Sequence, residues 1–184
     1  MTTSVRIQFL AIVLLLVACW PAFGQEFPAV EVSGGYTLLH DNELMKHGSG
    51  WYASGGFNFD RWTGLMIDVG GNYSNVTVAG IERNLRILSY MMGPQFSIRN
   101  ESQATPFVQI LIGGTTRSIT SVGDAVDRDL AMQLGGGVDW RFRPKVGLRA
   151  GAHFRHIFAN FQPSNGVRLE TGLVFTLGKR QDHR

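Results

Sequence analysis

One stretch of sequence decides the fold of this chain: Val167-Arg-Leu-Glu-Thr-Gly-Leu-Val-Phe-Thr-Leu-Gly178. In a β-strand, successive side chains point to opposite faces. One face of this stretch therefore carries only Val, Leu, Thr and Phe, and the other carries Arg168 and Glu170 among Gly, Val and Thr. An almost wholly apolar face opposite a charged face is typical of a strand with lipid outside and a polar lumen inside. The stretch thus indicates a membrane-spanning β-barrel.

The same alternation recurs after residue 25, in segments of about ten residues separated by turn-rich connections. The segments that share it are 29–39, 50–60, 64–73, 86–98, 106–115, 130–142 and 146–156. The connections between them alternate between short and long, as in bacterial barrels with short periplasmic turns and longer external loops. We therefore predict an all-β fold, an eight-stranded antiparallel, up-and-down transmembrane β-barrel with both ends on the periplasmic side.

Proline and glycine add local detail to this prediction. Pro94 lies inside the fourth segment and cannot donate a hydrogen bond to a neighbouring strand, so we expect a bulge there. Glycine clusters, such as residues 135–137, lie within the segments and not between them. We expect these glycines to ease the bending of a narrow barrel and to leave room for side chains in its lumen.

The first 24 residues have the organisation of a secretory signal peptide. Arg6 precedes an apolar run over residues 7–18, and a small-residue cleavage site follows at residues 22–24. The apolar run is too short to span a bilayer. We therefore assign residues 1–24 to a cleaved signal peptide and residues 25–184 to the barrel domain, with a short periplasmic C-terminal tail.

Cys19 is the only cysteine, and it ends the lipobox-like stretch Leu16-Val-Ala-Cys19. Cleavage before Cys19 with lipidation of its thiol is therefore an open alternative to cleavage after Gly24. With cleavage after Gly24 the mature chain has no disulfide, so packing and hydrogen bonding must hold its fold together.

Across the whole mature chain, the pattern resembles the small outer-membrane β-barrel proteins of the OmpA, OmpX and opacity type. The resemblance rests on the signal peptide, the eight alternating segments and the ending Thr171-Gly-Leu-Val-Phe-Thr-Leu177. This ending is similar to the insertion signal read by the barrel assembly machinery, with Gly172, Phe175 and Leu177 at its characteristic positions. Leu177 stands where the family usually has an aromatic residue, and residues 179–184 follow the signal.

The resemblance implies a location in the cell outer membrane, contact with outer-membrane lipid and lipopolysaccharide, and insertion by the barrel assembly machinery. It also implies a structural or surface-interaction role without enzymatic activity. The external partner is not implied, because the family's roles depend on loops that vary freely.

Ionisable side chains recur on the polar faces of the segments and at their ends. They are Glu31, Asp68, Arg99, Asp139, Arg141, Arg149, His153, Arg155, Arg168 and Glu170. A lone buried charge is costly, so we expect these side chains to pair in a lumen charge network. We expect Arg168 and Glu170 to pair with Arg149, His153 or Glu31, because the last segment neighbours the first and the seventh when the barrel closes. An eight-stranded barrel is just wide enough for side chains to fill it, which favours a plugged lumen.

Three alternatives remain open beside a plugged structural barrel. The first is a narrow pore for small solutes. The second is a soluble, lipocalin-like binding protein, which would need an apolar interior and a polar exterior. The third is an enzyme that modifies lipid A, which would need a Ser, a His and an acidic partner that converge. His153 and His156 share the seventh segment and Ser164 lies in the last loop, but the His-x-Ser spacing of the deacylases is absent.

Composition limits the remaining classes of function. The formal net charge is only +3, which gives no case for nucleic acid binding. No metal-binding cluster or nucleotide motif occurs, so we expect no cofactor and no metal. The long connections mix apolar with charged residues, for example at 76–82 and 158–161. These residues would serve external binding, or pack together and extend the strands above the membrane.

Overall fold

The computed structural model describes residues 26–41, 46–78, 81–100, 102–119, 125–158, 163–178 and 180–181. The predicted signal peptide, residues 1–24, lies outside the described residues, and so does Cys19. None of the described residues belongs to a helix that is long and apolar enough to cross a membrane.

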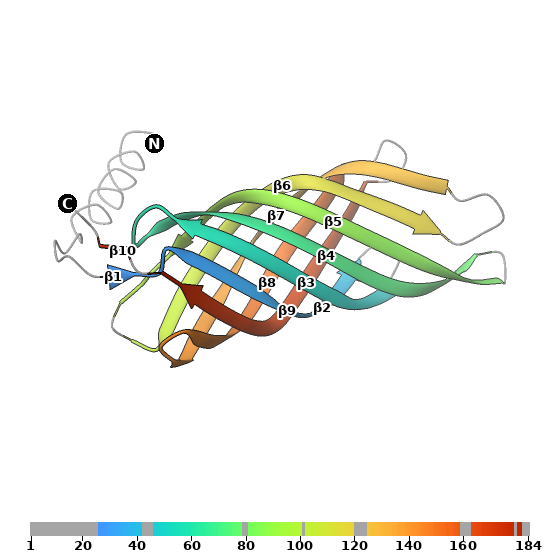
Figure 1. Cartoon of the computed structure of the whole chain (residues 1–184). Helices are drawn as coiled ribbons and strands as arrows, with labels where there is room; N and C mark the ends of the chain where they lie inside the picture. Colours follow the sequence, from blue (N-terminus) through green and yellow to red (C-terminus); the bar gives the residue numbers. More distant parts are fainter. Residues whose placement is uncertain are drawn as a thin grey trace, which may run out of the picture.

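In the described part of the chain, ten β-strands make up the regular structure (Figure 1). They are β1 (Glu26–Phe27), β2 (Val30–Asp41), β3 (Lys46–Asn58), β4 (Thr63–Val78), β5 (Ile81–Ser97), β6 (Ala104–Ile119), β7 (Ala125–Arg143), β8 (Val146–Phe158), β9 (Ser164–Leu177) and β10 (Arg180–Gln181). Strands β2 to β9 form a closed barrel in which each strand is hydrogen-bonded to the next one along the chain. All pairs are antiparallel, and β9 closes the ring by pairing with β2. The predicted eight-stranded, up-and-down barrel is confirmed.

A small second sheet lies at the end of the barrel where β2 begins and β9 ends (Figure 1). We call this end the periplasmic end and the opposite end the external end, following the orientation that the sequence predicts. It consists of β1 and β10, with Glu26 opposite Gln181 and Phe27 opposite Arg180. Phe27 is almost fully buried. The segment predicted as a C-terminal tail therefore pairs, at its start, with the residues that lead into the first barrel strand.

The strands have the inside-out polarity that their alternation predicts. On β9, Leu169 and Phe175 are 49% and 43% exposed, whereas Arg168 and Glu170 are 0% and 6% exposed. Charged, amide and hydroxyl side chains dominate the buried set, and the exposed large side chains are apolar. This distribution is the reverse of that in a water-soluble barrel, and it is expected where the hydrocarbon of a bilayer covers the outer face.

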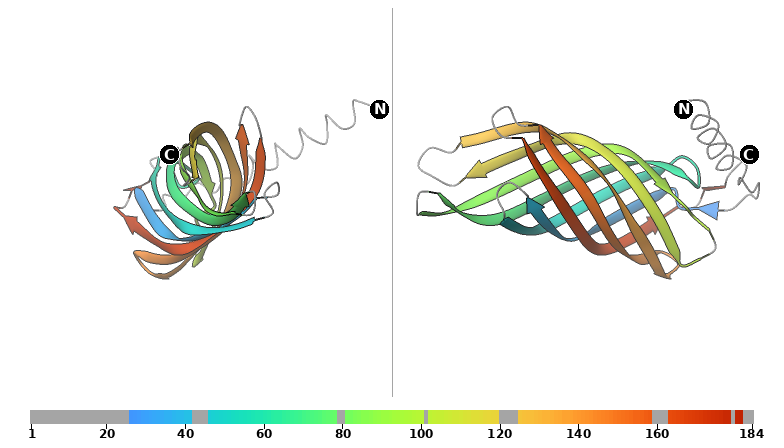
Figure 2. Two further views of the ribbon diagram at one scale, coloured as in Figure 1. Left: turned by 90° about the vertical axis from the view of Figure 1, so that its right-hand side faces the viewer. Right: turned by 180° about the vertical axis from the view of Figure 1, so that it is seen from behind.

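The strands β4 to β7 are longer than the sequence indicates. They contain 16, 17, 16 and 19 residues, whereas β2, β3, β8 and β9 contain 12 to 14. A tilted strand of about 9–11 residues suffices to span a bilayer. The hairpins β4–β5 and β6–β7 consequently reach far beyond the other strands at the external end (Figure 2). The strand extension predicted as one reading of residues 76–82 is confirmed, since β4 and β5 pair out to Val78 and Ile81.

Pro94 does not produce the expected bulge. The register between β4 and β5 is continuous past Pro94, and the pairs Met92–Ile112 and Gln95–Gln109 keep one register between β5 and β6. The ladder between β5 and β6 lacks only the two pairs of Gly93 and Pro94, because proline has no N–H to donate. The register shift in the described strands lies instead between Arg141 and Arg143, beside the β7–β8 turn.

At the seam that closes the barrel, two glycines face each other. Gly35 on β2 pairs with Gly172 on β9. A Cβ atom at Gly35 would overlap the backbone of Thr171 and Gly172, and a Cβ at Gly172 would overlap Gly34. Glycine allows this close approach because it has no side chain. The position of Gly172 in the last strand is therefore required by packing within the barrel.

Candidate functional site

A first group of charges fills the periplasmic half of the lumen, and we call it the periplasmic cluster. Its members are Glu31, Asn58, Arg99, Asp139 and Arg149. Arg149 donates two hydrogen bonds of 2.7 Å to Asp139, and its Nη2 lies 3.5 Å from Glu31 Oε2. Arg99 Nη2 lies 2.8 Å from Glu31 Oε1 and 2.9 Å from Asn58 Oδ1. Two guanidinium groups thus meet two carboxylates, so the cluster's formal charges balance.

A second group lies further along the lumen, and we call it the central cluster. Its members are Asp68, Gln133, His153, Arg155, Arg168 and Glu170. Arg168 donates to both oxygens of Asp68, at 2.7 Å and 3.3 Å. Glu170 lies between Arg168, at 3.6 Å, and His153, at 3.2 Å.

Gln133 connects the two arginines of the central cluster. Its Oε1 accepts hydrogen bonds from Arg155 at 2.8 Å and from Arg168 at 3.4 Å. Both arginines are almost fully buried, at 1% and 0% exposed. Burial of a charge is costly unless it has ionic or hydrogen-bonded partners. Arg168 has both kinds, in Asp68, Glu170 and Gln133, whereas the described partner of Arg155 is the side-chain amide of Gln133.

The structure changes two details of the expected network. Glu170 lies beside His153, as expected, but Arg168 is paired with Asp68 across the lumen instead of with Arg149, His153 or Glu31. Arg141 lies outside both clusters, at the periplasmic rim. It donates to the carbonyl oxygens of Asn100 and Ser102, at 3.4 Å and 3.0 Å. Arg141 keeps the register of β7, opposite Gly147, but it lies two residues from the end of the strand, beyond the charges inside the lumen.

Apolar side chains also occupy the lumen, and the alternation pattern did not point to them. Met66, Met91, Leu111, Ala131 and Ile157 form one buried cluster, with one residue from each of the strands β4 to β8. Nearer the external mouth, Leu39 of β2 joins Leu85 and Ile87 of β5 in a second cluster. Because β2 and β5 are not neighbours in the barrel, this second cluster crosses the opening.

Tyr52 is a further lumen residue that the sequence reasoning missed. Its ring is 2% exposed, and the guanidinium carbon of Arg168 lies 5.6 Å from its centroid. Phe107 occupies a similar place beside Arg149, at 4.6 Å. Aromatic faces attract cations when both are withdrawn from water. Both residues could have been found in the sequence, because each is an aromatic residue at an inward position of a strand.

Glycines make room for the central cluster, as the sequence analysis expects. A Cβ atom at Gly151 would lie 3.0 Å from His153 Nε2 and 3.1 Å from Glu170 Oε1. Gly135 pairs directly with His153, and a Cβ there would meet its imidazole. Side chains at these two positions would push His153 away from Glu170.

The two histidines of the enzymatic alternative have different partners, and Ser164 is the first residue of β9 instead of a loop residue. His153 is buried in the lumen beside Glu170. His156 Nδ1 lies 2.6 Å from Asn165 Oδ1, and its ring packs edge-on against Phe158. Within the described ranges, no group of three or more His, Cys, Asp or Glu side chains is arranged to hold a metal ion.

The residues of the expected insertion signal lie on the closing strand. Phe175 and Leu177 are 43% and 51% exposed on the lipid-facing side of β9. Gly172 lies on the lumen-facing side of the same strand, at the seam with Gly35. The three residues are thus spread over both faces of one strand, near its periplasmic end.

With this geometry established, comparison with known proteins places the chain. A family model described as "Outer membrane protein beta-barrel domain" matches residues 10–178. The chain belongs to this outer-membrane β-barrel family. The outer-membrane β-barrel protein is therefore located in the outer membrane, and its apolar outer face contacts lipid. No curated protein sequence matches it.

Solved structures share the barrel at low sequence identity. Neisserial surface protein A superposes with a TM-score of 0.66 and 13% identity, covering 80% of this outer-membrane barrel protein and 96% of the other chain. Ail of Yersinia pestis, in complex with the heparin analogue sucrose octasulfate, gives a TM-score of 0.53 at 13% identity, with 83% and 100% covered. The N-terminal barrel of Pseudomonas aeruginosa OprF gives 0.51 at 14% identity, with 82% and 98% covered. Identities this low show the fold alone.

Proposed function

We propose that this protein is a closed, non-conducting outer-membrane barrel that acts through its external surface. The observation that carries the proposal is the height of β4 to β7, which stand above a lumen that side chains fill. Neither transport nor catalysis is part of this function.

The filled lumen supports the absence of conduction. The periplasmic and central clusters occupy successive levels, and Arg149, Arg155 and Arg168 are each at most 2% exposed. The cluster of Leu39, Leu85 and Ile87 adds an apolar barrier near the external mouth. An ion that entered would have to break paired charges and cross this apolar layer, and both steps are costly.

The tall hairpins support a role in surface interaction. Pairing between β3 and β4 ends at Ser49–Tyr73, whereas β4 continues to pair with β5 as far as Val78. On the other side, β8 pairs with β7 only from Leu130, although β7 starts at Ala125. Residues 74–78 and 125–129 therefore each have a strand neighbour on one side only, among the described residues. Such edges expose backbone donors and acceptors that an extended segment of a partner protein can pair with.

Planar-bilayer recording tests the closed lumen. Purified, refolded protein should give no discrete conductance steps, and Glu170→Gln should behave in the same way. A general porin in the same bilayer shows that the assay detects channels. Reproducible channels in the wild type, altered by Glu170→Gln, would show that the barrel is a pore.

Panning a random-peptide phage library tests the external edges. The target is the full protein in lipid nanodiscs, and empty nanodiscs serve for counter-selection. Peptides enriched on the wild type should lose at least about tenfold in affinity for a trimmed variant, because strand addition depends on backbone pairing. In the trimmed variant, Asn-Gly replaces residues 76–83 as a two-residue hairpin turn.

A matched control carries only Ala79→Asn, which places the same Asn-Gly sequence at residues 79–80 while β4 and β5 keep their length. The control should retain peptide binding. Equal binding to the wild type and to the trimmed variant, or no enrichment over empty nanodiscs, would contradict a role for this hairpin.

The same proposal includes the export of the protein, its insertion into the outer membrane and its lipid surroundings. Signal peptidase cleaves after Gly24, and the barrel assembly machinery recognises Gly172, Phe175 and Leu177 on β9. Lipopolysaccharide surrounds the upper part of the outer face. N-terminal sequencing of protein from isolated outer membranes should begin at Gln25, and a lipid-modified Cys19 would instead show the lipoprotein route.

A further inference from the structure

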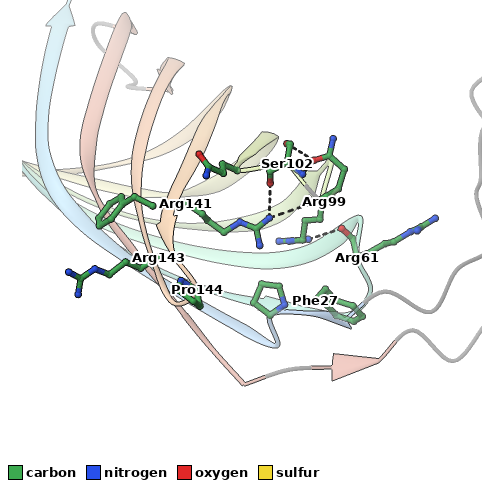
Figure 3. Close-up of a pocket in the computed structure, with 11 residues that line it drawn as sticks. Phe27, Arg61, Arg99, Ser102, Arg141, Arg143 and Pro144 are labelled. Carbon is green, nitrogen blue, oxygen red and sulfur yellow. Dashed lines mark hydrogen bonds between the residues drawn. The ribbon is translucent and has the colours of Figure 1, made fainter.

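A cavity of about 560 Å³ opens at the periplasmic end of the barrel (Figure 3). It lies between the β3–β4, β5–β6 and β7–β8 connections and the residues that precede β2. Phe27 and Pro28 form part of its wall. The cavity therefore lies outside the central cluster and at the opposite end from the tall hairpins.

The cavity is strongly basic. Arg61, Arg99, Arg141 and Arg143 line it, and none of the described lining residues is acidic. Glu31 balances the charge of Arg99 at 2.8 Å. Among the described residues, no carboxylate lies within salt-bridge distance of Arg141 or Arg143. Asp60, in the turn beside Arg61, accepts hydrogen bonds from the backbone of Trp62 and Thr63. The cavity thus presents an excess of positive charge.

A buried donor provides a second observation. Arg99 is 8% exposed, and its Nη1 donates to Arg61 O (Figure 3). Its Nη2 donates to Glu31 Oε1. Its Nε, which is buried, has no hydrogen-bond acceptor among the described protein atoms. A buried N–H of a charged group normally has an acceptor, because leaving it without one costs free energy. An anion in the cavity would provide that acceptor.

The position of the cavity indicates which kind of molecule would supply the anionic group. Phe142 lines the cavity and is also 55% exposed on the outer face of β7, where Trp140 is equally exposed. Aromatic residues at the ends of barrel strands lie at the level of lipid headgroups. The cavity therefore extends from the lumen mouth toward the headgroups of the periplasmic leaflet.

We infer that this cavity binds the phosphate of an anionic phospholipid headgroup from the periplasmic leaflet. Arginine suits this task, because its planar guanidinium donates two parallel hydrogen bonds to phosphate oxygens. Arg143, which is exposed, and Arg141, which is held at the rim by two carbonyls, supply the outer contacts. Arg99 supplies the inner contact. This site does not depend on the closed lumen or on external strand pairing.

Native mass spectrometry of the refolded protein tests the inference. The probes are phosphatidylglycerol, the uncharged lipid diacylglycerol, and inorganic phosphate as a competitor. The wild type should retain one phosphatidylglycerol in preference to diacylglycerol. The double variant Arg141→Gln/Arg143→Gln should retain about tenfold less, because two charge-assisted contacts are lost.

The charge-matched control is Arg86→Gln/Arg128→Gln, which removes two exposed arginines in the tall hairpins. It should retain phosphatidylglycerol as the wild type does. Heat-modifiable gel mobility verifies that each variant is folded. If the double variant does not fold, the single variant Arg143→Gln carries the test, because its exposed side chain makes no described hydrogen bond, and it should lower retention about threefold.

Two outcomes would overturn the inference. Equal retention by the wild type and the folded Arg141/Arg143 variant would show that these residues do not hold the lipid. Displacement of the lipid by millimolar inorganic phosphate would show a site for free phosphate rather than for a headgroup.

Discussion

Arg168 on β9 reaches across the lumen to Asp68 on β4, with Nη1 2.7 Å from Oδ1 and Nη2 3.3 Å from Oδ2. Two strands, β2 and β3, separate β9 from β4 around the ring. The ion pair therefore connects opposite parts of the wall, which the backbone ladder does not connect directly. Both side chains are at most 2% exposed, so water cannot replace either partner.

Removing one partner of this bridge should be costly. We expect Asp68→Ala to lower the free energy of unfolding by about 3–5 kcal/mol, because it leaves Arg168 charged and buried without its main partner. Reversible urea unfolding in lipid vesicles measures the change. The double variant Asp68→Leu/Arg168→Met should recover most of the loss, since it removes both charges together.

The partly exposed pair Arg117–Asp129, at 3.7 Å, serves as the control for the bridge. Asp129→Ala should change the free energy of unfolding by only about 0–1 kcal/mol. If Asp68→Ala costs no more than Asp129→Ala, the bridge does not stabilise the barrel.

The seam between β2 and β9 should be intolerant of side chains. We expect Gly35→Val to lower the yield of folded barrel sharply, because the new side chain would overlap the backbone of β9, and overpacking costs about 1–3 kcal/mol or more. Heat-modifiable gel mobility after refolding measures the folded fraction. Gly55→Ala is the control, since no heavy atom lies within 4 Å of a Cβ at that position. Similar yields for both variants would contradict the close approach.

An arginine on the outer face of the barrel should destabilise the protein more in the middle of the bilayer than at its edge. Ile110 is 42% exposed near the middle of the membrane-spanning part of β6. Ile110→Arg should therefore lower the free energy of unfolding by about 2–4 kcal/mol. Ile98 lies at the periplasmic end and is 52% exposed, so Ile98→Arg should cost only about 0–1 kcal/mol. Unfolding in vesicles compares the two variants. Equal losses in the two variants would mean that Ile110 and Ile98 do not lie at different depths in the bilayer.

Substitutions at the end of β9 should change the rate of assembly in cells more than they change the stability of the folded barrel. We expect Phe175→Ala to slow the appearance of the folded, heat-modifiable form, and Leu177→Phe to speed it, because an aromatic residue is usual at that position of the insertion signal. Pulse-chase labelling follows the conversion in cells. Leu173→Ala removes a similarly exposed side chain from the same strand and should leave the rate unchanged. A slower rate in all alanine variants would indicate lost lipid contact instead of a signal.

Alternation in the sequence was sufficient to predict the barrel, its strand count and the two faces of each strand. A strand in a bilayer has a period of two that lipid and lumen enforce along its whole length, so Leu169 and Arg168 could be assigned without a partner. Alternation predicts less beyond the bilayer, where lipid and lumen no longer impose opposite polarities on the two faces of a strand. It left the extension of β4 and β5 to Val78 and Ile81 as one of two open readings, because no membrane imposes polarity there.

Partners across the lumen were decided only by the tertiary structure. The sequence places Arg168 and Asp68 on inward faces, but their contact depends on the tilt and stagger of strands that are not neighbours. The same holds for Leu39 with Leu85 and Ile87, whose apolar side chains gave no sign that they meet across the mouth. The basic cavity beneath the barrel also depends on three connections brought together by closure of the ring. The sequence by itself therefore determined which side of the wall each residue faces, because that is a local property of the strand. The tertiary structure decided which residues meet inside, because that depends on the geometry of the closed barrel.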